Sequence, residues 1–331
     1  MSTDMAPARP VPRDVGALLR HAEEQARLAG AIPVLVRQRL APGSAATLRE
    51  DDLSLAGGFA DSIARHLVEA LAPDPDAVDA SLVAHEVVLA DPAATRLAHA
   101  RAIEARLCRN APLIGLAMAE LPPRVEAQVA DTQDELAEAA MALIVAQSRF
   151  VGNAQGFRLD LSELPPETVN ALVQRLTGWM QDRLQADPLV LRARADALLG
   201  GFDERRGRPH RLMRFCHLFA LPRAGDDWSL ADNGPSLGFA MLARASGLPF
   251  DHLIDMARDP DLSRLAVVVR GCDVPADTAA RLIEGIAMLA SLRLEAVPSA
   301  AALAAIGPDD AARLIAGWRN QLPLTTPGPL W

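Results

Sequence analysis

LPPETVNALVQRLTGWMQDRLQADP, residues 164–188, is the stretch that decides the fold class. Its apolar side chains recur at the spacing of three and four residues that lines one side of a helix, namely Val169, Leu172, Val173, Leu176, Met180 and Leu184. The prolines at 165 and 166 suit a first helical turn, where the missing amide would lack a partner anyway. Asp187-Pro188 then repeats a start signal, because an aspartate side chain caps the first free amides. The stretch therefore predicts one helix followed closely by another.

The same start signals recur along the chain. Asp74-Pro75, Asp91-Pro92 and Asp259-Pro260 each precede a helical pattern, and LPP at 121–123 repeats the start seen at 164–166. AARLIEG at 279–285 recurs as AARLIAG at 311–317, which indicates either a solenoid repeat or a chance similarity between alanine-rich helices. Short helices that restart at short intervals are typical of helix-pair arrays. The fold class we predict is all-α, an α-α superhelix of HEAT-like antiparallel helix pairs.

Three segments refine this prediction. The helix around Leu97, Ala100, Ile103 and Leu107 has one thin apolar stripe, whereas 139–146 is apolar on every side and is expected to lie between neighbouring helices. LAVVVRGC at 265–272 has the β-branched residues of a strand, but it has helical neighbours and no partner strand, so a buried helix is predicted.

Proline and glycine mark the expected domain organisation. Residues 1–13 read as a flexible N-terminal tail and 321–331 as a C-terminal tail. Between them we expect an N-terminal helical-repeat half at 14–150 and a C-terminal helical half at 160–320. The glycine-containing segment VGNAQGFRLDLSEL at 151–164 is the predicted joint between the halves.

Composition limits the classes of function. The 331 residues carry a net charge of −9, which argues against a protein coated in positive charge for nucleic acid, although a local basic patch remains compatible with it. The three cysteines are odd in number and none forms a C-x-x-C pair, as expected for reduced thiols. The first residues lack an apolar signal-peptide core, and no apolar run approaches the roughly 18 residues that span a bilayer. A cytoplasmic protein is therefore expected.

Three motifs carry a resemblance to a known family. They are the helix start LSELPPE at 161–167, the turn A-x-x-SGLP at 243–249, and the helix DPDLSRLAVVVR at 259–270. Together they resemble the bacterial family catalogued as domain of unknown function 2336, and the resemblance covers about residues 50–320. It implies a HEAT-like helical-repeat protein, and it brings no activity or catalytic residues with it. The N-terminal half departs from the regular repeats that such a family would have.

Two motifs resemble catalytic signatures, and each has a structural interpretation. Gly234-Pro235-Ser236-Leu237-Gly238 matches G-x-S-x-G, but the serine hydrolase elbow needs a strand before it, and a polar loop precedes it here. We expect Pro235 and Ser236 to open a helix instead. His85-Glu86 begins a zinc-protease pattern that lacks its second histidine, because position 89 is leucine, so a surface histidine is predicted.

A metal or nucleotide cofactor is not expected either. His210, Cys216 and His217 lie close in sequence, but on a helix position 216 points about 100° away from 217, and no fourth ligand is near. The chain contains neither G-x-x-x-x-G-K-[ST] nor G-x-G-x-x-G, the signatures of two common nucleotide-binding loops.

DERRGRPHRLMRF at 203–215 is the candidate binding segment. It concentrates positive charge in an acidic chain through Arg205, Arg206, Arg208, His210, Arg211 and Arg214. Arginine side chains pair with phosphates and carboxylates through two parallel hydrogen bonds. Pro209 is expected to start a helix with Arg211 and Arg214 on one face, opposite Leu212 and Phe215. The alternative is a solvated basic segment that pairs with the chain's own acids.

Two functions remain open at this point. The first is a non-enzymatic protein-protein interaction scaffold or adaptor, because stacked helix pairs create an extended concave surface. The second is anion or nucleic-acid binding through 205–214, with nucleic acid the lesser form because no aromatic residues interleave with the arginines to stack on bases. An enzyme built around Ser236 is the third and least favoured.

Overall fold

The computed structural model describes residues 15–40, 48–116, 121–130, 134–219 and 228–321. Within these ranges the protein is all-α, with no strand. The α-helices are α1 Val15–Ala29, α2 Ile32–Leu40, α3 Glu50–Leu71, α4 Ala80–Val83, α5 Pro92–Asn110, α6 Pro123–Gln128, α7 Asp134–Gln155, α8 Pro166–Leu184, α9 Pro188–Gly201, α10 Arg208–Leu218, α11 Leu230–Ser246, α12 Phe250–Met256, α13 Ser263–Gly271, α14 Ala276–Leu289, α15 Ala300–Ala304 and α16 Pro308–Gln321. Short 3-10 turns join several of them, including η4 Leu161–Glu163 and η5 Glu204–Arg206, and Ala84–Val88 forms a π turn.

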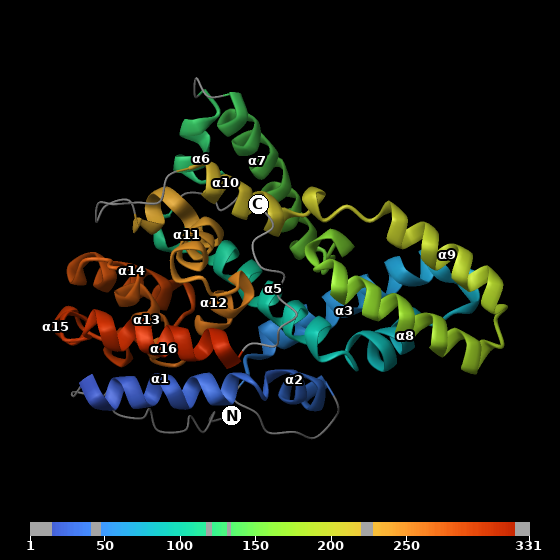
Figure 1. The fold of residues 1–331 in the computed structure, drawn as a ribbon, viewed down its shortest axis with the longest axis horizontal. Helices are drawn as coiled ribbons and strands as arrows, with labels where there is room; N and C mark the ends of the chain where they lie inside the picture. The colour runs from blue at the N-terminus through green and yellow to red at the C-terminus, as the bar shows by residue number, and fades with distance from the viewer. Residues whose placement is uncertain (1–14, 41–47, 117–120, 131–133, 220–227, 322–331) are drawn as a thin grey trace.

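Helix α5 runs through the middle of the molecule (Figure 1). It packs against α2, α3, α7, α11, α12 and α14. Every residue from Leu97 to Cys108 is buried, although the sequence predicted one thin apolar stripe. The buried stretch includes the acidic and basic side chains of His99, Arg101, Glu104 and Arg106.

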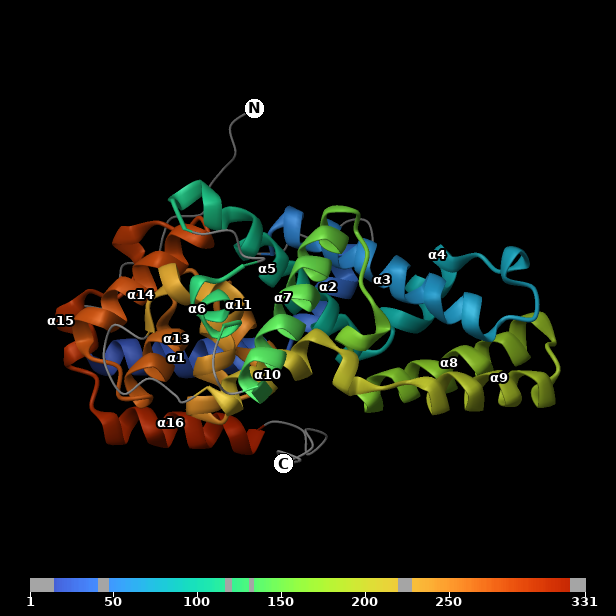
Figure 2. The ribbon, with the colours of Figure 1, turned by 90° about the horizontal axis from the view of Figure 1, so that it is seen from above.

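Two hydrophobic cores flank α5. The first core contains residues from α1, from one side of α5, from the start of α7 and from the helices α10 through α16. The other joins α3, the π turn, α8 and the end of α7 with the opposite side of α5. Figure 2 shows α3, α4, α8 and α9 reaching out at one end, and α14, α15 and α16 at the other. Both cores draw residues from before and after 151–164, so this segment does not separate them.

Most of the predicted helix starts are confirmed. Asp91 accepts hydrogen bonds from the amides of Ala93 and Ala94 at the start of α5, and Asp187 accepts one from the amide of Leu189 at the start of α9. The two LPP segments lead into α6 and α8, and 265–272 is a buried helix, most of α13, as expected. The repeated AARLI sequences lie within α14 and α16.

Three local predictions are wrong. Asp74 makes no capping hydrogen bond, and Pro75–Ala77 is a single 3-10 turn, whereas Asp79 caps the next helix, α4. Asp259-Pro260 does not cap a helix, because Arg264 holds both carboxylate oxygens of Asp259 at 2.7 Å. The N-cap residue of α13 is Leu262, and the amide of Ser263 donates to Asp261. Residues 139–146 are not enclosed by neighbours, because α7 packs through one side only and leaves Met141 57% and Val145 55% exposed.

The N-terminal tail at 1–13, and all but the first residue of the C-terminal tail at 321–331, lie outside the described residues. None of the helices in the described ranges combines the length and the apolar character required to cross a bilayer.

Candidate functional site

Helix α10 begins where the chain passes very close to η4. Gly207 is the N-cap, and a Cβ at that position would lie 2.1 Å from the carbonyl oxygen of Ser162. Only glycine permits this approach, because it has no Cβ. The approach brings Arg208 against Glu163, the neighbour of Ser162 in sequence. Pro209 lies in the first turn of α10, as predicted.

Arg208 points into the molecule and is only 2% exposed. Its guanidinium donates to both carboxylate oxygens of Glu104 at 2.5 and 2.8 Å and to both of Glu163 at 3.1 and 2.9 Å. It also donates to Gln147 Oε1 at 3.2 Å, and it lies 3.7 Å from the centre of the Phe150 ring. Arg208 therefore belongs to the interior and is separate from the surface arginines of 203–215.

The network around Arg208 extends through two more helices. Arg101 of α5 is ion-paired to Glu163 at 3.1 Å, to Glu104 at 3.3 Å and to Asp251 of α12 at 2.6 Å. The Ser236 hydroxyl of α11 donates to Glu104 Oε1 at 2.6 Å. We call this set the buried charged network, defined by Arg101, Glu104, Gln147, Glu163, Arg208, Ser236 and Asp251. It ties α5, α7, η4, α10, α11 and α12 together.

The network is ionic. Burial raises the pKa of Glu104, but Arg208, Arg101 and the Ser236 hydroxyl together outweigh burial and hold that pKa below its ordinary value. Burial likewise lowers the pKa of Arg208, and Glu104 and Glu163 outweigh it and raise that pKa. Buried charges of this kind are compensated by one another and by hydrogen bonds, so the removal of any one of them exposes the rest.

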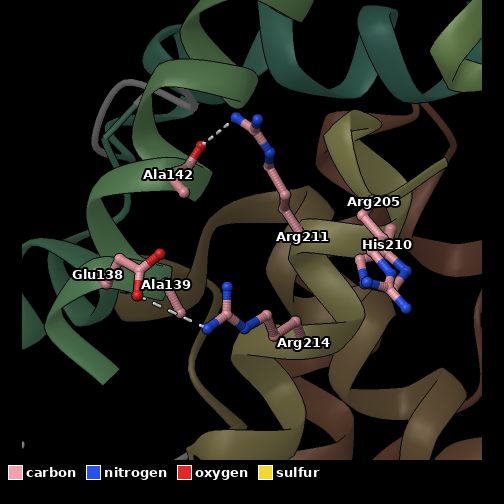
Figure 3. Close-up of a pocket in the computed structure, with 7 residues that line it drawn as sticks. All are labelled: Glu138, Ala139, Ala142, Arg205, His210, Arg211 and Arg214. Carbon is pink, nitrogen blue, oxygen red and sulfur yellow. Dashed lines mark hydrogen bonds and ion pairs between the residues drawn. The ribbon is translucent and has the colours of Figure 1, made fainter. Parts of the chain in front are cut away.

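The surface of α10 carries a hollow against α7, with a volume of about 400 Å³. We call it the α7–α10 hollow; its lining is Glu138, Ala139, Ala142, Arg205, His210, Arg211 and Arg214 (Figure 3). Arg211 donates to the carbonyl oxygen of Ala142 at 3.0 Å. Arg214 lies 3.7 Å from Glu135 and 3.8 Å from Glu138, distances at which a partly exposed pair is weak. Arg205 and His210 lie beside each other on the far wall of the hollow (Figure 3).

A second hollow of about 470 Å³ adjoins the first on the same helix and lies against the start of α8. We call it the α8–α10 hollow. It shares Arg205, His210 and Arg214 with the first hollow, and its other walls include the apolar side chains of Leu164, Pro165, Pro166, Met213 and Leu218. Arg101, Glu163 and Asp251 of the buried charged network form part of its lining. Burial lowers the pKa of His210, which favours its neutral form.

The structure thus brings together four of the six predicted binding residues. Arg205, His210, Arg211 and Arg214 line one hollow, whereas Arg208 is buried. Arg206 lines a separate, shallow depression with Arg149 and Arg158. The predicted helix face is confirmed, since Leu212 and Phe215 are buried on the side of α10 opposite the hollow.

Ser236 of the G-x-S-x-G motif is 3% exposed. Gly234, at φ 62°, kinks α11, and helical geometry resumes at Pro235, so that Pro235 and Ser236 open a helical segment as expected. The residues before it from Leu230 onward are helical rather than extended, so in this described stretch no strand leads into the motif. Ser236 accepts a hydrogen bond from Gln147 Nε2 at 3.1 Å and donates one to Glu104, which makes it a member of the buried charged network.

The remaining candidate motifs have structural roles. His85 is exposed on the π turn, as predicted, and Glu86 accepts hydrogen bonds from Trp179 Nε1 at 2.7 Å and from Arg183. Cys216 is buried while His217 is exposed, so the two side chains do not converge on one point. Burial raises the pKa of the Cys216 thiol to about 12, which keeps it protonated and disfavours metal binding.

No protein-family model, no curated protein and no solved structure matches this chain. The resemblance to the domain of unknown function 2336 family therefore stays a prediction.

Sequence reasoning missed the buried partners of Arg208. Arg101 and Glu104 lie three residues apart in a segment, RAIEARL, that reads as an ordinary amphipathic surface helix. The signal that was available is the thinness of the apolar stripe on α5. Four alanines of α5 are buried, namely Ala98, Ala100, Ala102 and Ala105. Because their side chains are small, neighbouring helices can approach α5 from every side.

Proposed function

We propose that the protein is a non-enzymatic scaffold or adaptor that binds a segment of another protein on the surface of α10. The observation that carries this proposal is that two hollows adjoin on this helix and share Arg205, His210 and Arg214. Adjoining pockets of different chemistry suit a peptide segment, because successive side chains of the partner enter different pockets.

The lining of the two hollows defines the partner. In the α7–α10 hollow three arginines stand against one glutamate, Glu138, so this hollow favours a carboxylate. The α8–α10 hollow combines apolar walls around Leu164, Pro165 and Met213 with the carboxylates of Glu135, Glu167 and Glu204. It therefore favours a long apolar side chain and disfavours a second acidic one. We therefore infer a partner segment in which an acidic residue stands close to a large apolar one.

The buried charged network supports this proposal because it fixes the position of α10. Arg208, in the first turn of α10, is fixed by Glu104 and Glu163, and Gly207 packs against the Ser162 carbonyl. A helix held in this way presents its outer side chains without a cost for ordering the backbone, which favours affinity.

The non-enzymatic part of the proposal rests on Ser236. The side chain that most resembles a nucleophile is buried, and its hydroxyl proton is directed to Glu104 at 2.6 Å. A serine nucleophile must instead reach a substrate and have a base beside it.

We also propose three further properties, which concern the helix arrangement, the family and the cellular compartment. The antiparallel neighbours α8 and α9, joined by three residues, are the kind of pair from which a HEAT-like superhelix is built. The same arrangement is what the resemblance to the domain of unknown function 2336 family implies. Cys108, Cys216 and Cys272 form no disulfide among the described residues, which is in keeping with a reducing compartment such as the cytoplasm.

A peptide-display selection against the full chain tests the proposed function. We expect enrichment of segments that combine acidic and large apolar residues. Their affinity should fall at least tenfold in the double variant Arg205→Glu, Arg214→Glu. The matched control is Arg192→Glu on α9, an arginine whose side chain is 82% exposed. Selected peptides that bind the double variant as tightly as the wild type would contradict the proposal.

Anion or nucleic-acid binding is the second candidate, and the convergence of Arg205, Arg211 and Arg214 on one hollow favours it. Binding of pyrophosphate or a single-stranded oligonucleotide should then weaken steeply as salt rises, because each phosphate contact releases counterions. The triple variant Arg205→Ala, Arg211→Ala, Arg214→Ala should abolish it. Arg208 is left intact in this variant because it holds the interior together. An isotherm that the triple variant does not change would exclude this function.

A further inference from the structure

A separate cavity of about 210 Å³ lies on the other side of the molecule from α10. Its walls come from α1, α2, α5, α12, α13 and α16. The side chains of Ile32, Leu248, Met256 and Trp318 make most of its surface apolar. The proposed function makes no use of this cavity.

Arg96 of α5 also lines the cavity. Among the described residues it forms neither a hydrogen bond nor an ion pair. Arg264 lines the same cavity but differs from Arg96 because it has carboxylate partners. Arg264 donates to Asp259 at 2.7 Å and to Asp255, the one carboxylate in the described lining of the cavity, at 3.0 Å, so these charges already neutralise one another. An arginine that lines a mainly apolar cavity and has no carboxylate of its own is a site for an external anion.

His252 supplies a second polar group to the same cavity. Its Nδ1 atom is buried and has no hydrogen-bond partner among the described residues. Burial, and after it the nearby positive charge of Arg96, lower the pKa of His252. The imidazole is therefore neutral at pH 7, and it adds no second positive charge to the cavity.

We infer that this cavity binds a small organic carboxylate with an apolar body. The carboxylate accepts two parallel hydrogen bonds from Arg96, and the apolar body packs against Ile32, Met256 and Trp318. A single negative charge suffices, because Arg96 is the only lining cation in the described chain that is without a carboxylate partner. The volume corresponds to that of about seven waters in the liquid, which limits the ligand to a small one.

Calorimetric titration of the full-length protein with benzoate and hexanoate tests this inference. The uncharged probes benzamide and hexanamide have nearly the same shape and serve as the comparison. We expect the carboxylates to bind at least tenfold more tightly than the amides. Quenching or enhancement of tryptophan fluorescence should accompany binding and disappear in Trp318→Phe, because Trp318 is part of the cavity wall.

Variants locate the site. Arg96→Gln should weaken carboxylate binding at least tenfold, and Arg96→Lys should weaken it less, because lysine keeps the charge but loses the paired geometry. Arg27→Gln at the edge of the cavity, where the side chain is 78% exposed, should leave the affinity within about twofold, because exposed charges are largely screened. Circular dichroism confirms that each variant is folded, and Arg96→Lys serves in place of Arg96→Gln if the latter is not.

Three results would overturn the inference. The first is no heat from either carboxylate at about 10 mM ligand. The second is equal affinity for carboxylates and amides, and the third is unchanged affinity in the folded Arg96 variants. Loss of peptide binding at α10 would leave all of these measurements as they are, so the failure of one proposal is distinguishable from the failure of the other.

Discussion

Helix α5 lies at the centre of the molecule and helix α9 lies at its outer end, although both begin with an Asp-Pro cap (Figure 1). Both are built mainly of alanine, leucine and arginine. In α5 every residue from Leu97 to Cys108 is buried, whereas in α9 Leu191 is the one buried residue. The helix with more charge is the one inside.

The difference lies in where the charges find partners. On α9, the ion-pair partner that Arg192 has in the described part of the chain is Asp196 of its own helix, at 4.0 Å, and both side chains are exposed. On α5, Arg101, Glu104 and Arg106 are held by residues from α3, η4, α10 and α12. A charge can be buried when partners from several elements surround it. In this protein such charges specify which helices meet at α5, so we expect them to matter far more than those of α9.

The largest effect is expected from Glu104→Gln. The substitution keeps the shape of the side chain but leaves Arg101 and Arg208 short of one negative charge in the interior. Loss of one partner from a buried ion network costs about 3–5 kcal/mol. Unfolding in urea should show this loss, and Arg194→Ala on α9 should change the unfolding free energy by less than about 0.5 kcal/mol. A loss below about 1 kcal/mol for Glu104→Gln would show that the interior tolerates the imbalance.

A double-mutant cycle at Asp52 and Arg106 sharpens the comparison. Arg106 donates to the two carboxylate oxygens of Asp52 at 2.7 and 3.2 Å, which joins α5 to α3, and both side chains are buried. Each single variant, Asp52→Leu or Arg106→Met, should lose about 3 kcal/mol because it leaves one buried charge unpaired. The double variant should lose much less than the sum, with a coupling of about 1–3 kcal/mol. Strict additivity in urea unfolding would mean that the pair is solvated in solution.

The all-α fold class of this protein follows from interactions between residues that are close in sequence, and for that reason it could be predicted. Proline and aspartate at 91–92 and 187–188 fix helix starts through backbone amides only a few residues away. The start of α10, with Pro209 in its first turn, and the two faces of that helix follow in the same way. The prediction at Asp259-Pro260 failed because a side chain five residues away, Arg264, takes the aspartate that would have been the cap.

The candidate site could be predicted only in part. Arg205, His210, Arg211 and Arg214 share a hollow because they lie on one short segment of chain. The different role of Arg208 could not be predicted, because its partners Glu104 and Glu163 are 104 and 45 residues away in sequence. The cavity beside Arg96 could not be predicted for the same reason, since six helices form its walls. Long-range partners decide the role of a charged residue, and periodicity carries no information about them.

A smaller effect is expected from His99, which is also buried on α5. Burial lowers its pKa, against the opposing influence of Asp255 and Asp52. Below the ordinary histidine value of about 6.5, the unfolded chain binds a proton that the folded protein does not. Stability should therefore fall as the pH falls through 6.5, and stop falling once the pH is below the folded-state pKa.

The slope that His99 contributes is at most about 1.4 kcal/mol per pH unit. Urea unfolding of the wild type and of His99→Gln between pH 5 and 8 measures it, and the variant should have a flatter profile in this window. His210 and His252, whose pKa values burial also lowers, contribute in the same direction and remain in both proteins. Identical profiles for wild type and variant would mean that His99 becomes protonated in the folded state.

The smallest effect is expected at the outer face of α9. Leu189 is 78% exposed there, and Leu191, two residues further on, is fully buried. Because an exposed side chain loses little contact with water on folding, Leu189→Ser should change the unfolding free energy by less than about 0.5 kcal/mol. The same substitution at a covered leucine would remove about 2 kcal/mol or more. A loss of more than about 1 kcal/mol for Leu189→Ser, measured in urea at several protein concentrations, would show that α9 is covered in solution. If that loss grew with protein concentration, a second copy of the chain would be packing on α9. The position of α9 would then be stabilised by contacts between two molecules, whereas that of α5 is stabilised by contacts within one.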